Sequence, residues 1–335
     1  MLLNPKDNQS NESVCRVSQS NNQELKNQSV NSKEIPLAGT DSIIKSQVSL
    51  AAYTSYRVGG PAQWYVAPRN LEELQASVEY AKKHSLPITV LGAGSNLLVS
   101  DHGIEGLVIV TRHLRHTQFD KDTGLVTVSA GEPIPALACE AAKQGYQGFE
   151  WAVGIPGTMG GAVVMNAGAH KGCIADILVS AEVLLPDGSL QTLRCDQLEY
   201  SYRTSKLQGS DIIVTQATFQ LQPGADPTQV LAVTKQHQKQ RLTTQPYHLP
   251  SCGSVFRNPK PYAAGWLIEN TGLKGFQIGN AQVAQRHANF IVNCGGATAR
   301  DIFYLIRHVQ NEVQKRWSIL LHPEVKMIGE FQAIG

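Results

Sequence analysis

A glycine-rich segment that follows a short apolar run is the first place where the backbone of this chain could bind a ligand. Residues 91–99 read LGAGSNLLV, and glycines let a backbone adopt positive φ and approach a ligand closely. Successive N–H groups in such a turn form a nest that binds phosphate oxygens, and Ser95 and Asn96 add side-chain donors. An ordinary glycine-rich turn fits equally well. The dinucleotide fingerprint G-x-G-x-x-G is not met, because Leu97 replaces its third glycine.

A second glycine-rich segment lies further along the chain. Residues 154–162 read GIPGTMGGA, and small residues continue through 167–169. So many glycines together with a proline predict neither a regular helix nor a regular strand. Two separate loops of exposed N–H groups suit a long, bent ligand that contains a pyrophosphate. We prefer this interpretation to a purely structural turn.

Three polar segments carry side chains capable of proton transfer or charge stabilisation. Residues 200–205 read YSYRTS, residues 251–259 read SCGSVFRNP, and residues 322–325 read HPEV. Serine is a poor acid, and arginine and glutamate are usually surface charges, so each segment alone is more typical of structure than of catalysis. No G-x-S-x-G motif is present, which disfavours a serine hydrolase.

The composition excludes several classes of protein. Hydrophobic residues make up 42% and charged residues 17% of the 335 residues, a globular balance, and the net charge of +2 suggests neither nucleic-acid nor membrane-surface binding. The six cysteines form no C-x-x-C pair, so no metal is expected, and such scattered cysteines are typical of a cytoplasmic protein. Neither a transmembrane run nor the apolar region of a signal peptide is found. We expect a cytoplasmic monomer.

The periodicity of apolar residues predicts the elements that position these segments. Helices are expected over residues 71–81, 134–141 and 302–313, where apolar residues recur at helical spacing. Strands are expected at residues 88–91, 125–129, 182–185, 211–221 and 325–331, with a hairpin turn at Asp187-Gly188. Helices and strands mixed without strict alternation indicate the α+β class. Residues 1–46 are rich in Asn, Gln and Ser and lack aromatic residues, which predicts a disordered tail that is dispensable for chemistry.

Taken together, in this order and spacing, these segments resemble the UDP-N-acetylenolpyruvoylglucosamine reductase family over residues 54–328. Residues 54–60, TSYRVGG, and the first glycine loop look like the start of that family's FAD domain. The resemblance implies a two-lobed FAD-binding module of the vanillyl-alcohol-oxidase (PCMH) type and a C-terminal α+β substrate-binding domain. The expected limits are 47–225 for the module, with lobes at 47–112 and 113–225, and 226–335 for the C-terminal domain.

The resemblance also implies a reaction and the residues that serve it. FAD, bound noncovalently and reduced by NADPH, would reduce the enolpyruvyl ether of UDP-N-acetylglucosamine to UDP-N-acetylmuramate in peptidoglycan precursor synthesis. Substrate contacts are expected from Tyr202, Arg257 and Asn258. The expected FAD-binding residues are Arg57, Gly92, Ala93, Gly94, Ser95, Asn96, Leu97, Gly154, Ile155, Gly157, Thr158, Gly160, Gly161 and Ala167.

The family's catalytic trio carries over to Arg203, Ser254 and Glu324. Hydride addition to the vinyl group leaves negative charge on the adjacent carbon, conjugated into the carboxylate. Arg203 and Glu324 would hold and polarise that group, with Glu324 carrying or sharing a proton. Ser254 would donate the proton that completes the reduction. A serine suffices because the carbon that it protonates is strongly basic.

Some features depart from the family pattern, and two other functions are compatible with parts of the sequence. Thr204 stands where many relatives have an acidic residue, and Cys252 where alanine is common. The short interval between Arg203 and Ser254 resembles the family's shorter, type II-like subtype. One alternative is an oxygen-using flavoprotein oxidase of the same superfamily, whose covalent flavin link would point to His170. The other is a nucleotide-binding regulator without activity, which would not need Ser254 and Glu324.

Overall fold

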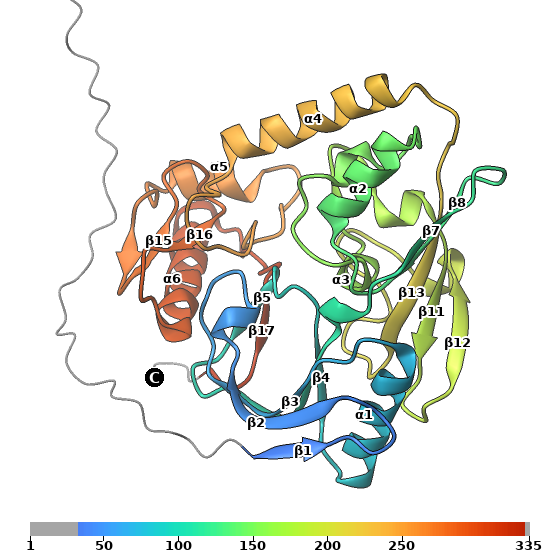
Figure 1. Cartoon of the computed structure of the whole chain (residues 1–335). Coiled ribbons are helices and arrows are strands. Elements are labelled where there is room, and N and C mark those ends of the chain that lie inside the picture. The colour runs from blue at the N-terminus through green and yellow to red at the C-terminus, as the bar shows by residue number, and fades with distance from the viewer. Residues whose placement is uncertain (1–32, 332–335) are drawn as a thin grey trace, which may run out of the picture.

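The first lobe is built on a five-stranded sheet in the computed structural model, which describes residues 33–331 (Figure 1). In spatial order its strands are β1 (Glu34–Pro36), β2 (Ile43–Ser49), β3 (Pro61–Val66), β6 (Ile104–Val110) and β4 (Ile88–Leu91). The last three strands are parallel, and β1 and β2 extend the sheet in antiparallel pairing. Helix α1 (Leu71–Lys83) begins where the Asn70 side chain accepts the Glu73 N–H at 2.8 Å, and it buries Leu74 and Val78 in the lobe's core.

The disordered tail predicted for residues 1–46 is wrong for residues 34–46. These residues form β1 and the beginning of β2, and they bury Leu37 and Ile44 in the first lobe's core. Few apolar residues are sufficient for this segment to fold, because the backbone of β2 pairs with β3 and the sheet provides the remaining apolar surface. Residues 1–32 of the predicted tail lie outside the described residues.

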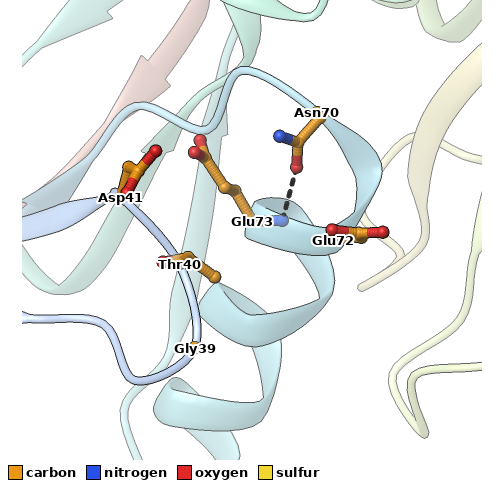
Figure 2. Close-up of a pocket in the computed structure, with 6 residues that line it drawn as sticks. All are labelled: Gly39, Thr40, Asp41, Asn70, Glu72 and Glu73. Carbon is orange, nitrogen blue, oxygen red and sulfur yellow. Dashed lines mark hydrogen bonds between the residues drawn. The ribbon is translucent and has the colours of Figure 1, made fainter.

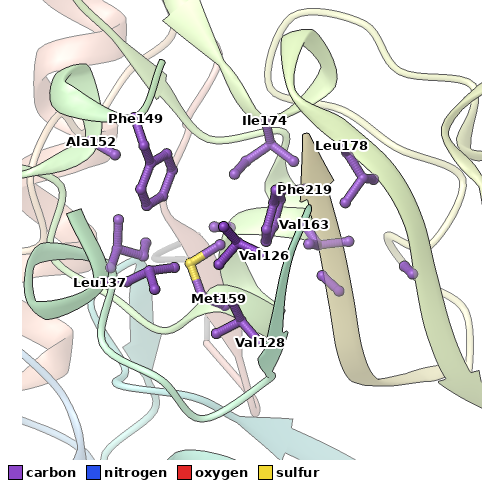
Figure 3. Close-up of a cluster of buried hydrophobic side chains, with 14 of the residues drawn as sticks. Val126, Val128, Leu137, Phe149, Ala152, Met159, Val163, Ile174, Leu178 and Phe219 are labelled. Carbon is purple, nitrogen blue, oxygen red and sulfur yellow. The ribbon is translucent and has the colours of Figure 1, made fainter. Parts of the chain in front are cut away.

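The second lobe is an antiparallel sheet covered by helices. In spatial order its strands are β12 (Leu190–Arg194), β11 (Leu178–Leu184), β13 (Ile213–Gln220), β8 (Leu125–Ser129) and β7 (Thr117–Phe119). Helices α2 (Ile134–Lys143) and α3 (Met159–Met165) pack on it, and a small hairpin of β9 (Gly168–Ala169) and β10 (Gly172–Cys173) follows. Figure 3 shows the core between them, in which Leu137, Met159 and Phe219 lie close together.

The C-terminal domain combines three helices with short strands. Its elements are α4 (Pro227–Thr244), α5 (Ala264–Asn270), β14 (Gln277–Ile278), β15 (Ala281–Val283), β16 (Ile291–Asn293), α6 (Ala299–Trp317) and β17 (Lys326–Ile328). Figure 1 shows the long helix α4 crossing from α2 of the second lobe to α5. Helix α6 begins at a capping box, in which the Thr298 hydroxyl accepts the Asp301 N–H and the Asp301 carboxylate accepts the Thr298 N–H, each at 3.0 Å.

A strand pairing and a helix cap are among the contacts that join the C-terminal domain to the first lobe. Strand β17 pairs in parallel with β5 (Leu97–Val99), which follows the first glycine loop. The Asp101 carboxylate also accepts the N–H groups of Ala299 and Arg300, at 2.8 and 2.9 Å. A carboxylate is stabilised at the N-terminus of a helix, so Asp101 ties helix α6 to the loop after β5.

Most of the predicted elements are confirmed. The expected helices correspond to α1, α2 and α6, the expected strands to β4, β8, β11, β13 and β17, and Asp187-Gly188 lies in the turn between β11 and β12. The prediction that residues 154–162 contain no helix is wrong at its end, because α3 begins at Met159. Gly160 lies within that helix where a Cβ would come 2.9 Å from the Ala130 Cβ. Glycine at this position therefore permits close packing of helix on strand.

Short 3-10 turns connect several elements: Ala51–Tyr53, Thr111–His113, Glu150–Ala152, Ile174–Asp176 and Cys195–Leu198. The predicted domain limits near residues 112 and 225 fall in connections between elements, and they stay predictions. None of the helices between residues 33 and 331 is both long and apolar enough to cross a membrane. Within the same range no group of three His, Cys, Asp or Glu side chains is arranged to hold a metal ion.

The burial of Ile44 gives a direct test of the corrected N-terminal boundary. Ile44 is fully buried, whereas the neighbouring Ile43 is 41% exposed. We expect Ile44→Ala to lower the free energy of unfolding by about 2–5 kcal/mol, because it leaves a cavity in the core. Ile43→Ala is the matched control and should change it by less than about 0.5 kcal/mol. Equal effects of the two substitutions in urea unfolding would show that residues 34–46 are not part of the folded lobe.

Candidate active site

A partly buried ion pair joins the second lobe to the C-terminal domain. Arg203 lies in the tight turn closed by the Ser201–Thr204 bridge, with a φ of +58°. Its Nε donates to the Glu324 Oε1 at 2.8 Å, and its Nη2 donates to the Gly168 carbonyl at 2.7 Å. The two side chains are 21% and 15% exposed. Arg203 is therefore held in one orientation by two acceptors from different parts of the chain.

The backbone around Glu324 is fixed by segments far away in sequence. The Glu324 N–H donates to the Val255 carbonyl at 2.7 Å, and the Glu324 carbonyl accepts from the Asn96 side-chain amide at 3.1 Å. Two residues later, the Lys326 N–H donates to the Asn96 carbonyl at 2.9 Å. The structure thus brings the first glycine loop, the serine segment and the glutamate segment into direct contact.

Ser254 immediately precedes Val255 in this arrangement. The segment is held by Asn289, whose side chain accepts the Phe256 N–H at 2.9 Å and donates to the Phe256 carbonyl at 2.8 Å. Ser254 itself is half-buried, and across residues 33–331 its hydroxyl makes no hydrogen bond. The hydroxyl is therefore available to a ligand, while the backbone that carries it is fixed.

Arg203 and Arg257 act on the Glu324 carboxylate, and a third cationic side chain, Lys326, lies near Arg257. Arg257 donates from Nη2 to the Arg203 carbonyl at 3.2 Å, and its buried Nε has no hydrogen-bond partner in the described part of the chain. Burial, together with the nearby Arg257, lowers the pKa of Lys326. Burial also raises the pKa of Glu324, and this effect exceeds the opposing influence of Arg203 and Arg257. The site can attract an anionic group, and burial makes the Glu324 carboxyl harder to ionise than a carboxyl in water.

The two glycine loops meet each other. The Ser95 hydroxyl donates to the Pro156 carbonyl at 2.9 Å. A Cβ on Gly92 would collide with the Thr158 hydroxyl, which is buried and has no hydrogen-bond partner within residues 33–331. An unpaired buried hydroxyl beside a surface that only glycine leaves open is the kind of place where a ligand oxygen or nitrogen is missing. This arrangement fits a bound cofactor such as FAD.

The other predicted cofactor residues are explained in different ways. Gly94 has a φ of +64°, and a Cβ there would strike the Tyr53 carbonyl, so local folding alone requires glycine. Gly154 lies under the Arg241 side chain, and the Tyr247 hydroxyl donates to its carbonyl at 3.0 Å. The residues Ala93, Asn96 and Leu97 complete the first loop, and Ile155, Gly157, Gly160, Gly161 and Ala167 belong to the second loop and to α3 or its end.

Three residues predicted to contact the cofactor or the substrate make no hydrogen bond to the Arg203–Glu324 pair. Arg57 has a φ of +57°, and its exposed side chain makes no hydrogen bond or ion pair among the described residues. Tyr202 is 54% exposed, with its ring 5.4 Å from the Arg203 guanidinium carbon. Asn258 uses its amide oxygen to accept the Ala264 N–H at 2.9 Å at the start of α5.

Two site residues were not predicted from the sequence. Asn289 holds the serine segment through a contact across 33 residues of chain, and nothing in its local sequence indicates that role. Lys326 stands two residues after Glu324 in an extended segment. Because Glu324 lies before the strand, the two-residue spacing alone does not place the two side chains on one face.

One cavity of the molecule lies away from the Arg203–Glu324 pair. It has a volume of about 330 Å³ and is lined by Gly39, Thr40, Asp41, Asn70, Glu72 and Glu73, as Figure 2 shows. The Glu73 carboxylate is already paired with the Ser42 hydroxyl and the Arg69 N–H, at 2.8 and 2.7 Å. An acidic cavity of this kind does not suit phosphates, and it contains none of the predicted site residues.

Comparison with known proteins agrees with this geometry. A model described as the C-terminal domain of UDP-N-acetylenolpyruvoylglucosamine reductase matches residues 245–328, and a model described as an FAD-binding domain matches residues 62–194. The chain is 72% identical over 307 residues to UDP-N-acetylenolpyruvoylglucosamine reductase of Nostoc sp. (strain PCC 7120 / SAG 25.82 / UTEX 2576), covering 92% of this chain and 93% of the relative. It is 58% identical over 299 residues to the enzyme of Synechocystis sp. (strain ATCC 27184 / PCC 6803 / Kazusa), covering 89% and 94%.

The fold is shared with a solved structure. The crystal structure of UDP-N-acetylenolpyruvylglucosamine reductase from Thermus caldophilus aligns with a TM-score of 0.73 and 36% identity, covering 85% of this chain and 98% of that one. The expected α+β class, with an FAD-binding module and a C-terminal domain, is confirmed. From the identities over nearly the whole chain, the protein belongs to the UDP-N-acetylenolpyruvoylglucosamine reductase family.

Proposed function

We propose that this protein uses NADPH and noncovalently bound FAD to reduce the enolpyruvyl ether of UDP-N-acetylglucosamine to UDP-N-acetylmuramate, as a cytoplasmic monomer in peptidoglycan precursor synthesis. The observation that carries the proposal is the buried Arg203–Glu324 pair, held against both the serine segment and the first glycine loop. Arg203 comes from the second lobe, Glu324 and the serine segment from the C-terminal domain, and the glycine loop from the first lobe. A site of this kind can hold cofactor and substrate side by side.

FAD is assigned to the junction of the two glycine loops. The unpaired Thr158 hydroxyl and the N–H groups of residues 92–97, Gly154 and Gly157 would hold it, whereas the N–H groups of Ile155, Met159 and Gly160 already donate to main-chain carbonyls. When bound, FAD supplies the hydride transfer between NADPH and the substrate double bond. A covalent link through His170 is not proposed, since its ring is 4.1 Å from that of His237 on α4, centroid to centroid.

The charged residues are proposed to act on the substrate's enolpyruvyl group. Arg203, Arg257 and Lys326 would orient its carboxylate by charge-assisted hydrogen bonds. Glu324, whose pKa is raised by burial, would hold a proton near the carboxylate and stabilise the negative charge that develops. Ser254 would donate its hydroxyl proton to the carbon next to the carboxylate, and solvent would restore that proton. Tyr202 and Asn258 would complete the substrate contacts.

The reaction itself can be tested on purified protein. We expect a yellow protein whose colour is released into the supernatant by acid precipitation. It should oxidise NADPH only when UDP-N-acetylenolpyruvoylglucosamine is added, and mass spectrometry should show a product two hydrogens heavier. Anaerobic turnover should equal aerobic turnover, whereas an oxidase would require oxygen. Colour that remains in the precipitate, or NADPH consumption independent of the substrate, would contradict the proposal.

Replacement of Ser254 should separate the two halves of the reaction. In Ser254→Ala we expect NADPH to bleach the flavin absorbance at the wild-type rate, because that step needs no proton from the serine. Recolouring by substrate should slow about 10²–10⁴-fold, the usual contribution of a positioned acid. Stopped-flow absorbance measures both steps. Ser254→Cys should recolour faster than Ser254→Ala but more slowly than wild type. Ser251→Ala, a control in the same segment, should recolour at the wild-type rate. Recolouring of Ser254→Ala at the wild-type rate would exclude Ser254 as the acid.

The raised pKa of Glu324 should appear in the pH dependence of stability. The folded protein binds this proton more tightly than the unfolded chain, whose carboxyl has a pKa near 4.5. The resulting stabilisation is complete below that value and is lost as the pH rises through the raised pKa. Relative to Glu324→Gln, wild type should therefore lose free energy of unfolding as the pH rises above 4.5 in urea titrations.

Glu312 provides the control for this measurement. Its hydrogen bond to Lys315 lowers the pKa of its exposed carboxyl, so wild type should gain stability relative to Glu312→Gln as the pH rises towards 4.5. The two differences should have opposite signs. A pH-independent difference for Glu324→Gln would show that the carboxyl has the same pKa in the folded protein as in the unfolded chain.

A further inference from the structure

Three aromatic rings form a ladder on the surface of the C-terminal domain. The Tyr262 and Trp266 rings are nearly parallel, 15° apart with centroids separated by 5.6 Å, and Trp266 lies 5.2 Å from Trp317. Tyr262 and Trp266 are 45% and 46% exposed. Large aromatic side chains that share so much exposed surface at one place often mark a binding surface.

One end of the ladder is covered and the other is open. The Arg316 guanidinium carbon lies 5.5 Å from the Trp317 ring, and the Trp317 Nε1 donates to the Thr271 hydroxyl at 3.1 Å. These contacts fix the inner ring. Tyr262 is the last ring in the series and leaves a face for one more planar group.

The open end lies next to the proposed substrate segment. The Tyr262 N–H donates to the Pro259 carbonyl at 2.7 Å, and Asn258 accepts the Ala264 N–H at the start of α5. Along the chain, the residues proposed to act on the enolpyruvyl group come first, at Ser254 and Arg257. Asn258 follows, and Tyr262 comes one short turn later. The enolpyruvyl sugar, the pyrophosphate and the uridine of the substrate are joined in the same order.

We infer that Tyr262, supported by Trp266, is the stacking platform for the uracil ring of the nucleotide sugar. This inference rests on the proposed function. A base stacks on an aromatic ring through π-faces and needs no hydrogen bond from the protein. The ladder is therefore a specificity element for the nucleotide end of the substrate, separate from the groups that act on the double bond.

Steady-state kinetics of Tyr262→Ala test the assignment. The KM for UDP-N-acetylenolpyruvoylglucosamine should rise at least about fivefold, in line with the usual contribution of stacking one base. The kcat and the KM for NADPH should stay within about twofold of wild type. Tyr262→Phe keeps the ring and should retain the wild-type KM. Phe276→Ala is the matched control, because Phe276 is also exposed (39%) and stacks on His308 away from the ladder.

The outcomes that overturn the inference are specific. An unchanged KM for the nucleotide sugar in Tyr262→Ala excludes the platform. A rise in the KM for NADPH alone assigns the ring to the coenzyme instead and also overturns the inference. Loss of affinity in Phe276→Ala equal to that in Tyr262→Ala would show a general effect of removing a surface ring.

Calorimetric binding of UDP and of inorganic pyrophosphate separates the inference from the proposed reaction. Tyr262→Ala should weaken UDP binding at least about fivefold and leave pyrophosphate binding unchanged. If wild type binds UDP in this Tyr262-dependent way but does not reduce the enolpyruvyl ether, the platform stands and the proposed reaction fails. If wild type reduces the ether while UDP affinity is equal in both proteins, the reaction stands and the platform fails.

Discussion

The main chain of Glu324 is hydrogen-bonded to two different parts of the molecule, and the site's geometry depends on this pairing. Val255 accepts its N–H and Asn96 donates to its carbonyl, while β17 continues beside β5 in parallel register. Hydrogen bonds that hold a main chain on both sides leave little freedom to the residues between them. The carboxylate, the serine hydroxyl and the glycine loop are thereby placed relative to one another independently of the Arg203–Glu324 contact.

The same pairing allows a carboxylate and three cations to coexist in a partly buried place. Removing a charge from water is costly unless an opposite charge and good hydrogen bonds replace the solvent. Arg203 obtains both from Glu324 and the Gly168 carbonyl, whereas the Arg257 Nε remains without a partner in the described chain. The excess of positive charge destabilises the protein when no ligand is bound, and an anionic ligand would offset this destabilisation.

The sequence predicts what is local and misses what depends on distant contacts. Apolar spacing is sufficient to predict α1, α2 and α6, because the buried face of an amphipathic helix is visible as a periodic pattern in the helix's own sequence. Strands β1 and β2 were missed because Ile44 has few apolar neighbours in sequence and obtains its burial from the sheet. Helix α3 was missed because its glycines argue against a helix unless the packing partner, Ala130, is known.

In the candidate site too, local motifs are visible in the sequence and the contacts between distant residues are not. The resemblance identified Arg203, Ser254 and Glu324 as candidates, but the contacts that join them lie between residues far apart in the chain. No local sequence pattern identifies Asn289, because its role is to hydrogen-bond the N–H and the carbonyl of a residue far away in the chain, Phe256. Arg57 shows the converse, because a motif residue can lie in a well-defined turn without any contact to the ion pair.

The pairing of β5 with β17 also sets an order of events during synthesis. A ribosome delivers the glycine loop long before Glu324, and the two strands are separated by more than 200 residues, Lys326 facing Leu97. Closing so long a loop carries an entropic cost that must be met before the contact stabilises anything. Each lobe has its own core and can collapse early, but the pairing of β17 with β5 forms only after the segment that carries Glu324 and β17 has been synthesised. A chain that lacks β17 leaves the edge of β5 unpaired, and an unpaired edge strand can pair with another chain.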